Sequence, residues 1–326
     1  EIATPMGVVL GLLPLTNPVP TLVFKTLICL KTRNALIASC HRGAMGVGNQ
    51  AGELIQAVLR RHGAPVDLVQ WIRERTSRQL TSMFMGHKDV AFILATGGPS
   101  MVKAAYSSGT PAIGVGPGNA PAWICGDADL EAAARNVIDG KSFENGTLCG
   151  SENHLVVDRS VRETFISTLE AHGAAVLTPE EAGRLASHVI DSQTGHLRRK
   201  VLGQPAQYLA QGAGIRRDTP IRLIVVPVDL DELHGPYGGE KLAPILSLFT
   251  VEGQEEGLVL CKRLLARKGA GHTAVIHTRD PLLAERYGLE IPANRVLINS
   301  SGAQGCFGIG TGLTPSAVLG CGTMGG

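Results

Sequence analysis

The chain has 326 residues, 44% of them hydrophobic, so it can bury a large core, and its length is that of about two ordinary domains. Its 30 basic and 28 acidic residues leave a net charge of +2, and only 4% of residues are aromatic, which argues against nucleic-acid binding and membrane-surface binding. The seven cysteines are odd in number and include no C-x-x-C pair. This pattern argues against a disulfide framework and a zinc ribbon, and it favours a reducing, cytoplasmic location.

The first part of the chain alternates short apolar runs with helical patterns. Strands are predicted at residues 8–13, 35–39, 66–71, 90–95 and 112–115, and helices at 21–31, 47–62, 77–85 and 100–107. The opening apolar run, 6–15, is too short and too interrupted by glycine and proline for a membrane span. The alternation predicts a parallel sheet with helices on both faces, and unbroken apolar runs are typical of strands covered on both sides. We therefore predict an α/β domain of the nucleotide-binding type.

A second α/β unit is predicted to follow a helix at residues 129–141. Its strands are expected at 155–157, 223–226, 274–277 and 296–299, and its helices at 161–172, 179–190 and 254–268. Beyond residue 300 the chain is rich in glycine and is predicted to form a long loop, with a last strand at 314–319.

Cys149 lies in a polar, glycine-flanked turn between a predicted helix and a predicted strand. A thiol in such a loop can be held exposed and rigid, as covalent catalysis requires, whereas a cysteine that only fills a turn is the simpler alternative. Cys306 and Cys321, also in glycine-rich turns, are its competitors as nucleophile. The cysteines within apolar runs are expected to pack in the core: Cys29, Cys125 and Cys261.

Two glycine-rich loops follow predicted strands. Thr96, Gly97 and Gly98 open a helix, where glycines let the backbone approach a phosphate and the helix amides attract its charge. The loop matches neither the G-x-G-x-x-G pattern nor a P-loop, so a plain turn is the alternative. The loop 114–119, which contains Gly116, lies at a strand end, where open α/β sheets bind ligands, and it too could be only a turn.

Three further side chains are candidates for chemistry. Asn17 lies between a strand and a helix, where its amide could donate to an oxyanion or simply form a turn or cap. Glu240 lies in a turn ahead of an apolar strand and could accept ribose hydroxyls or be a solvated surface carboxylate. His272 precedes a strand and could act in acid–base catalysis or be incidental, as most of the ten histidines should be.

Together these stretches resemble the aldehyde dehydrogenase superfamily, and within it the CoA-acylating branch, which includes the aldehyde half of bifunctional aldehyde–alcohol dehydrogenases. The matching segments occur in order along nearly the whole chain: Pro5-Met-Gly-Val-Val9, Thr16-Asn17-Pro18, Phe24-Lys25, Lys31-Thr-Arg-Asn34, Ala95-Thr-Gly-Gly-Pro99, Val102-Lys-Ala-Ala-Tyr-Ser-Ser-Gly109, Gly114-Val-Gly116 with Gly118-Asn119, Phe143-Glu-Asn-Gly146 with Cys149, Glu240-Lys241-Leu242, Gly271-His272-Thr273 and Leu319-Gly-Cys-Gly-Thr323. Each segment is weak alone, but the ordered combination is specific.

The resemblance implies a fold of two α/β domains. A Rossmann-like cofactor domain is expected at residues 1–140, a catalytic domain at 141–310 and a C-terminal return segment at 311–326. Family members carry a further N-terminal segment that completes the cofactor domain, and a C-terminal tail, so both are expected to be missing from this sequence. The resemblance also implies a homodimer or larger oligomer, a cytoplasmic or bacterial-microcompartment location, and in some members a fused or partner iron-dependent alcohol dehydrogenase.

The resemblance also implies residue roles. Cys149 is the expected nucleophile, forming a thiohemiacetal and then a thioester. Asn17 with the backbone N–H of Cys149 is expected to form the oxyanion hole, and His272 to help the CoA thiol react. The cofactor, NAD or NADP, is expected to contact a group of residues that comprises Ser39, His41 and Arg42 at its adenosine end, Thr96, Gly97, Gly98 and Gly116 near its pyrophosphate, and Glu240 at its nicotinamide ribose.

The loop 116–119 departs from the hydrolytic members of the superfamily, which carry a glutamate base there. Without a base to activate water, the acyl-enzyme is expected to wait for CoA, which favours acyl-CoA over a free acid and, in reverse, reduction of acyl-CoA to aldehyde. The expected substrates are therefore a small aldehyde and CoA. A hydrolytic aldehyde dehydrogenase and a non-catalytic relative are the alternatives. No metal is expected, because adjacent Cys40 and His41 lack partners at ligand spacing.

Overall fold

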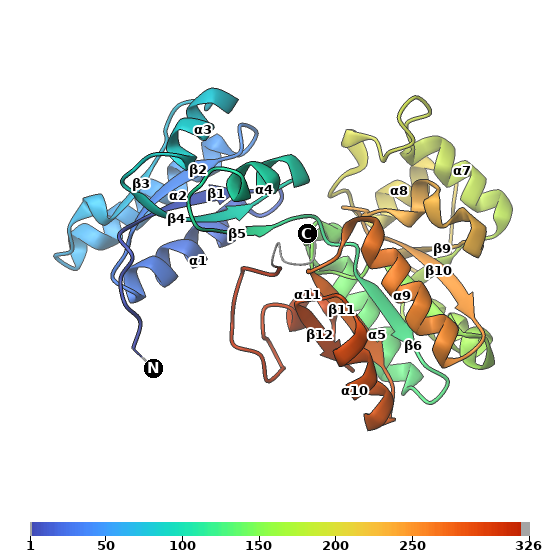
Figure 1. Ribbon diagram of the computed structural model, residues 1–326. Helices are drawn as coiled ribbons and strands as arrows, with labels where there is room; N and C mark the ends of the chain where they lie inside the picture. Colours follow the sequence, from blue (N-terminus) through green and yellow to red (C-terminus); the bar gives the residue numbers. More distant parts are fainter. Residues whose placement is uncertain (1, 321–326) are drawn as a thin grey trace. The chain divides into compact units, whose positions relative to one another are not determined.

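The structure, a computed structural model that describes residues 2–320, divides into two compact units. Figure 1 shows its helices and strands, coloured by position along the chain. Unit 1 comprises the described residues up to Gly116 and those from Ser316 onward, and unit 2 runs from Pro117 to Pro315. Within residues 2–320 no helix is long and apolar enough to span a membrane. The assignment of cofactor and catalytic roles to residues 1–140 and 141–310 stays a prediction.

Unit 1 is built on a five-stranded parallel sheet with the order β3-β2-β1-β4-β5. Its strands are β1 (Val8–Leu13), β2 (Ala35–Cys40), β3 (Val69–Trp71), β4 (Val90–Thr96) and β5 (Ala112–Val115). The connecting helices are α1 (Pro18–Lys31), α2 (Met45–Arg61), α3 (Arg78–Met85) and α4 (Pro99–Tyr106). The strand order reverses between β1 and β4, so their carboxyl ends form the crevice where sheets of this topology bind ligands.

Small residues bring α2 close to the sheet of unit 1. A Cβ added at Gly52 would lie 2.5 Å from the ring of Trp71, and one added at Gly48 would overlap the sulfur of Cys40. On the sheet itself, β1 is buried except for the partly buried Val8, and Val9 and Leu36 belong to the core, because both faces of the central strands are covered; the edge strands β3 and β5 each carry one exposed residue, Gln70 and Ile113. The continuous apolar runs of the sequence reflect this two-sided burial.

Unit 2 contains a seven-stranded parallel sheet with the order β12-β11-β6-β7-β10-β9-β8. Its strands are β6 (Pro121–Ile124), β7 (His154–Asp158), β8 (Ala174–Val176), β9 (Leu223–Pro227), β10 (Ile245–Val251), β11 (Thr273–His277) and β12 (Arg295–Ile298). Its helices are α5 (Leu130–Ser142), α6 (Arg162–Ala171), α7 (Pro179–Val189), α8 (Ala206–Gly212), α9 (Gln254–Lys268), α10 (Pro281–Glu290) and α11 (Gly302–Gly305). The largest hydrophobic cluster joins the strands to residues of α7, α8, α9 and α10.

Most of the predicted elements are confirmed to within a few residues, and the parallel α/β class is confirmed in both units. The predicted last strand at 314–319 is wrong, because these residues form no strand. Pro315 lacks an N–H to donate, and the Ser316 hydroxyl exchanges hydrogen bonds with the backbone of Val318, which favours a local turn. The elements β6, β8, α8, α10 and α11 were not predicted.

Candidate active site

The backbone that leads into Cys149 is strained. Directly after α5, Glu144, Asn145 and Gly146 all have left-handed φ values, of 47°, 52° and 72°. A left-handed conformation costs about 1–3 kcal/mol for a non-glycine residue and persists only where the surroundings impose it. Here the Asn145 side chain donates to the carbonyl of Gly203 at 3.0 Å. A Cβ on Gly146 would lie 2.5 Å from the carbonyl oxygen of Ala243, so only glycine fits both the angle and the space.

Gly118 lies where three predicted site residues meet. Its N–H donates to Oε1 of Glu240 at 3.0 Å. A Cβ on Gly118 would lie 1.9 Å from the carbonyl oxygen of Cys149 and 3.3 Å from Cε1 of His272. The structure thus brings Cys149, Glu240 and His272 around one glycine, although they are far apart in the sequence.

Cys149 is partly exposed as a residue, whereas the other five described cysteines, Cys306 among them, are buried. This removes Cys306 as an accessible competitor, while Cys321 lies outside the described residues. Burial of the sulfur, and next the charge of Glu240, raise the pKa of the Cys149 thiol to about 12. The backbone N–H groups of Cys149 and Gly150 oppose this shift by stabilising the thiolate. The thiol therefore needs help to ionise near neutral pH.

The carboxylate of Glu240 lies beside the loop 116–119, whose own sequence contains no acidic residue. Its side chain is partly buried, and burial raises its pKa to about 7, against the lowering effects of the Gly118 hydrogen bond and of Lys141. The idea of Glu240 as a freely solvated surface group is therefore wrong. An acidic side chain does lie beside the loop 116–119, and it comes from a different part of the chain.

His272 is fully buried just before β11. Its Nδ1 is 2.9 Å from the hydroxyl of Thr273, and its Nε2 has no hydrogen-bond partner among residues 2–320. Burial lowers the pKa of the imidazole to about 4, so the ring is neutral at physiological pH. A buried polar atom without a partner is uncommon, so Nε2 of His272 is an unsatisfied group of the site.

Asn119, in the same loop as Gly118, is fully committed to the fold. Its amide group donates to the carbonyls of Gly238 and Leu264 at 3.2 and 2.9 Å, and its Oδ1 is 2.9 Å from Nε2 of His154. These contacts fix the loop 116–119 against three other segments of unit 2. Asn119 is therefore a structural residue of the site.

Unit 1 carries the predicted cofactor loop at the carboxyl end of β4. Gly98 precedes α4, is exposed, and has open space where a Cβ would project. Beneath the loop, the buried ammonium of Lys25 donates to the carbonyls of Leu12 and Leu94 at 2.7 Å and to the hydroxyl of Thr96 at 3.1 Å. Lys25 thus joins the ends of β1 and β4 at the crevice of this sheet, a contact that the sequence analysis missed.

The other predicted residues of unit 1 lie at the ends of β1 and β2. Asn17 is the residue before α1, but its side chain makes no capping hydrogen bond, and its NH₂ group donates to no described residue. Simple helix capping by the side chain is therefore excluded. Ser39 is buried at the end of β2, and His41 and Arg42 are exposed directly after it. Their roles, like that of Gly116, stay predictions.

In a comparison to known families, the model described as "Aldehyde dehydrogenase family" matches residues 1–311. The chain belongs to the aldehyde dehydrogenase family. It is 38% identical over 330 residues to the bifunctional aldehyde-alcohol dehydrogenase AdhE of Escherichia coli K12. That match covers 100% of this chain but only 37% of the relative, so the sequence corresponds to part of that protein.

Solved structures of acylating aldehyde dehydrogenases have the same fold. An acetylating aldehyde dehydrogenase from Geobacillus thermoglucosidasius matches with a TM-score of 0.92 and 40% identity, over 98% of this chain and 70% of that one. A propionaldehyde dehydrogenase from Rhodopseudomonas palustris, solved with bound CoA and an acylated cysteine, matches with a TM-score of 0.90 and 29% identity, over 99% of this chain and 72% of that one. The resemblance drawn from the sequence motifs is confirmed.

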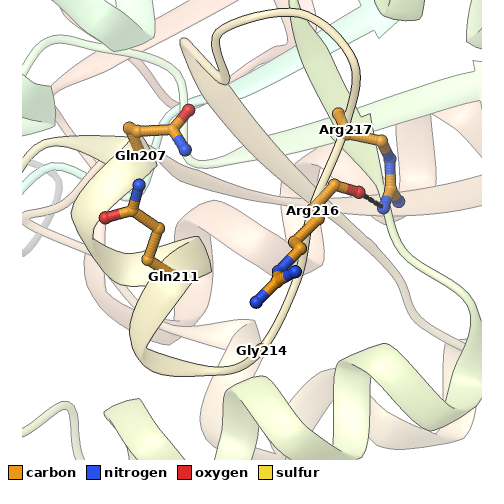
Figure 2. Close-up of a pocket in the computed structure, with 5 residues that line it drawn as sticks. All are labelled: Gln207, Gln211, Gly214, Arg216 and Arg217. Atoms are coloured by element: carbon orange, nitrogen blue, oxygen red, sulfur yellow. Dashed lines mark hydrogen bonds between the residues drawn. The ribbon is translucent and has the colours of Figure 1, made fainter.

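A surface pocket of about 420 Å³ lies elsewhere in unit 2. Figure 2 shows Gln207 and Gln211 on α8 and two arginines on the segment that follows; the lining residues are Gln207, Gln211, Gly214, Arg216 and Arg217. Arg217 is paired with Glu181, and the lining contains no predicted site residue. Within residues 2–320 no group of three or more His, Cys, Asp or Glu side chains is arranged to hold a metal ion. The absence of a metal cofactor remains a prediction.

Proposed function

We propose that the complete protein is a CoA-acylating aldehyde dehydrogenase, which converts an aldehyde, CoA and NAD(P)⁺ reversibly to acyl-CoA and NAD(P)H. The observation that carries this proposal is that Gly118 lies against the backbone carbonyl of the partly exposed Cys149, against the ring of His272 and against the Glu240 carboxylate, so that all three residues meet at one glycine. The structural relative with an acylated cysteine and bound CoA supports the same chemistry.

In the proposed mechanism, the Cys149 thiolate attacks the aldehyde carbon and forms a thiohemiacetal. The backbone N–H of Cys149 stabilises the oxyanion. The family resemblance implies the same role for the amide of Asn17, whose NH₂ group donates to no described residue. A bound nicotinamide dinucleotide supplies the hydride acceptor. Loss of hydride leaves a thioester on Cys149, and the CoA thiolate then attacks this carbonyl and releases the cysteine.

The residues of unit 1 fit a dinucleotide. The crevice between the ends of β1 and β4, the open space beside Gly98 and the start of α4 suit a pyrophosphate. Ser39, His41 and Arg42 follow β2, where the adenosine end is expected, and the exposed Arg42 is a candidate partner for a 2′-phosphate. In unit 2, one Glu240 oxygen accepts from Gly118, which leaves the other for the nicotinamide ribose.

His272 is assigned a role in the acyl-transfer step. Because its pKa of about 4 keeps the imidazole neutral, Nε2 either accepts the proton of the CoA thiol or donates to the thioester oxygen, depending on the tautomer. His272→Ala should therefore slow acyl-CoA formation more than it slows acylation of Cys149. A pre-steady-state burst of NADH followed by a slow steady state would show this difference.

Hydrolysis to a free carboxylate is the second candidate, and the carboxylate of Glu240 beside Gly118 favours it. A glutamate with a pKa of about 7 is well matched to activating water at neutral pH. Its hydrogen bond to Gly118 occupies one oxygen but does not prevent that role. Glu240→Gln separates the two candidates, because it should abolish carboxylate formation if Glu240 is the base.

The test is product analysis of the purified protein with a short aldehyde and either nucleotide, with and without CoA. The acylating proposal predicts acyl-CoA as the product and little NADH beyond the first turnover without CoA. Equal rates of NADH release with and without CoA, with free acid as product, would refute it. Absence of all turnover, with Cys149 inert to aldehyde, would support a non-catalytic relative.

We also propose, from the family resemblance, that the complete protein is a homo-oligomer in the cytoplasm or, like the Clostridium phytofermentans relative, in a bacterial microcompartment. Its partners are the aldehyde and CoA, with neither nucleic acid nor membrane. Because the relative in E. coli is named a bifunctional aldehyde-alcohol dehydrogenase, a fused or partner alcohol dehydrogenase belongs to this proposal. Light scattering of the complete protein and an assay with a short alcohol and NAD⁺ test these two points.

A further inference from the structure

A buried lysine in unit 2 braces the segments that carry the candidate active site. Lys141 lies in the last turn of α5 and is 0% exposed. Its ammonium donates to the carbonyl of Lys241 at 2.8 Å, to Oδ1 of Asn153 at 3.2 Å and to the hydroxyl of Ser151 at 3.4 Å. One cation therefore binds both the segment that follows Cys149 and the segment that follows Glu240.

Asn153 completes this connection. Its Oδ1 also accepts from the backbone N–H of Lys241 at 2.7 Å, and its NH₂ group is 3.5 Å from the carbonyl oxygen of Gly118. Both backbone polar groups of Lys241, the residue next to Glu240, are thus bound by Lys141 and Asn153. The same asparagine reaches the loop whose N–H holds the Glu240 carboxylate.

The turn before Glu240 is held as well. The ammonium of Lys241 is fully buried and donates to the carbonyls of Tyr237 and Gly239 at 2.7 and 2.9 Å. Glu240 therefore lies in a segment whose backbone is fixed on both sides by buried groups. Charged side chains are rarely buried, because a buried charge is costly unless other groups bind it. Two buried lysines beside Glu240 therefore indicate a role other than filling space.

We propose that Lys141 and Asn153 are positioning residues, which hold Glu240 against Gly118 and thereby set its place beside Cys149. Without Lys141, the Lys241 carbonyl and the Asn153 oxygen lose a buried donor, and the Glu240 segment is free to move. Burial lowers the pKa of the Lys141 ammonium to about 8, and the carboxylates of Glu240 and Glu152 oppose this shift. The third charged group near Lys141 is the buried Lys241, whose pKa the Lys141 charge lowers further. The proposal deepens the proposed function, since it concerns the same site.

The test is a double-mutant cycle read by alkylation of Cys149 with iodoacetamide at pH 7.5, where Glu240, with a pKa of about 7, is mostly ionised and Lys141, with a pKa of about 8, is mostly protonated. Mass spectrometry of the Cys149 peptide gives the rate constant. Glu240→Gln removes a negative charge that disfavours the thiolate, so alkylation should be roughly three- to tenfold faster in the otherwise unchanged protein. In a Lys141→Met or Asn153→Ala background, Glu240 is no longer held and this factor should fall to about one.

Asp158→Asn is the matched control. Asp158 is buried at the other end of β7, where its carboxylate accepts hydrogen bonds from Trp123 and Gly126. Its replacement therefore destabilises the same strand but leaves the hydrogen bonds of Lys141 and Asn153, here called the brace, in place. In the Asp158→Asn background, Glu240→Gln should still accelerate alkylation of Cys149 by its full factor. Three results would overturn the proposal. Glu240→Gln could accelerate alkylation as much in the Lys141 and Asn153 variants as in the unsubstituted protein. It could have no effect in the unsubstituted protein, or it could lose its effect in Asp158→Asn.

Two features keep the test decisive. If Lys141→Met fails to fold by circular dichroism, the neutral replacement Asn153→Ala carries the cycle alone. Alkylation requires no aldehyde, nucleotide or CoA, so the result is independent of whether the acylating reaction is correct. Conversely, a protein that makes free acid but shows the predicted coupling would refute the proposed function and support the brace.

Discussion

Gly118→Ala is the substitution that tests the geometry of the site most sharply. The added Cβ would lie 1.9 Å from the carbonyl oxygen of Cys149, and real Cβ atoms essentially never come closer than 3.0 Å to such an atom. The backbone of Cys149 or Gly118 must therefore retreat by about 1.1 Å, the difference between these two distances. Overpacking of this kind costs about 1–3 kcal/mol of stability.

The effect on turnover should exceed the effect on stability. A shift of about 1 Å in a reacting group lowers the rate roughly 100-fold, so kcat/KM for NADH formation with aldehyde and CoA should fall by about that factor. A cooperative urea-unfolding transition should show that Gly118→Ala is still folded in the absence of urea. Gly183→Ala is the control, since it lies in α7 with open space at its Cβ position and should gain about 0.5–1 kcal/mol. Wild-type kcat/KM in Gly118→Ala would refute the reasoning.

Three further predictions are measured by urea unfolding. Burial raises the pKa of Glu152 from 4.5 to about 7, so the unfolded protein releases this proton at lower pH than the folded protein does. The contribution of Glu152 to the free energy of unfolding is therefore fully present below pH 4.5 and is lost as the pH rises through about 7. Glu152→Gln should therefore flatten the fall in stability across that window by up to about 3 kcal/mol; an unchanged pH dependence would contradict this. Thr178 forms a capping box with Glu181 at α7, so Thr178→Ala should cost about 1 kcal/mol and Thr178→Ser much less. Equal stability of the two Thr178 variants would contradict it. Lys25→Met removes the donor for two buried carbonyls and should cost about 2–4 kcal/mol, whereas a loss below about 1 kcal/mol would show that the contacts contribute little.

The sequence predicted the fold class because most strands are buried on both faces and appear as continuous apolar runs. β1 was predicted at its observed bounds for this reason. β6 was missed because Pro121 begins it directly after a glycine-rich loop, a pattern that indicates a turn, although all four of its residues are buried inside the second sheet. α10 carried a readable signal, since Asp280 caps it and Pro281 begins it, and this signal was overlooked.

The candidate site was predictable as a set of residues but not as an arrangement. Family motifs singled out Cys149, Glu240 and His272, yet nothing local indicates that Glu240 accepts a hydrogen bond from Gly118, 122 positions away. The hydrogen bonds of Lys141 could not be predicted either, because a lysine in a helix is ordinarily solvated and only the fold shows that Lys141 is buried. Long-range pairings of this kind depend on strand order, which a single sequence does not contain.

The central claim is that a thioester on Cys149 persists until CoA removes it. The most direct measurement is peptide mass spectrometry of the protein after reaction with a short aldehyde and NAD(P)⁺ in the absence of CoA. The account predicts an acyl group on Cys149 and its quantitative transfer to acyl-CoA when CoA is added. An unmodified Cys149 with free acid accumulating, or an acyl group on a different cysteine, would contradict it.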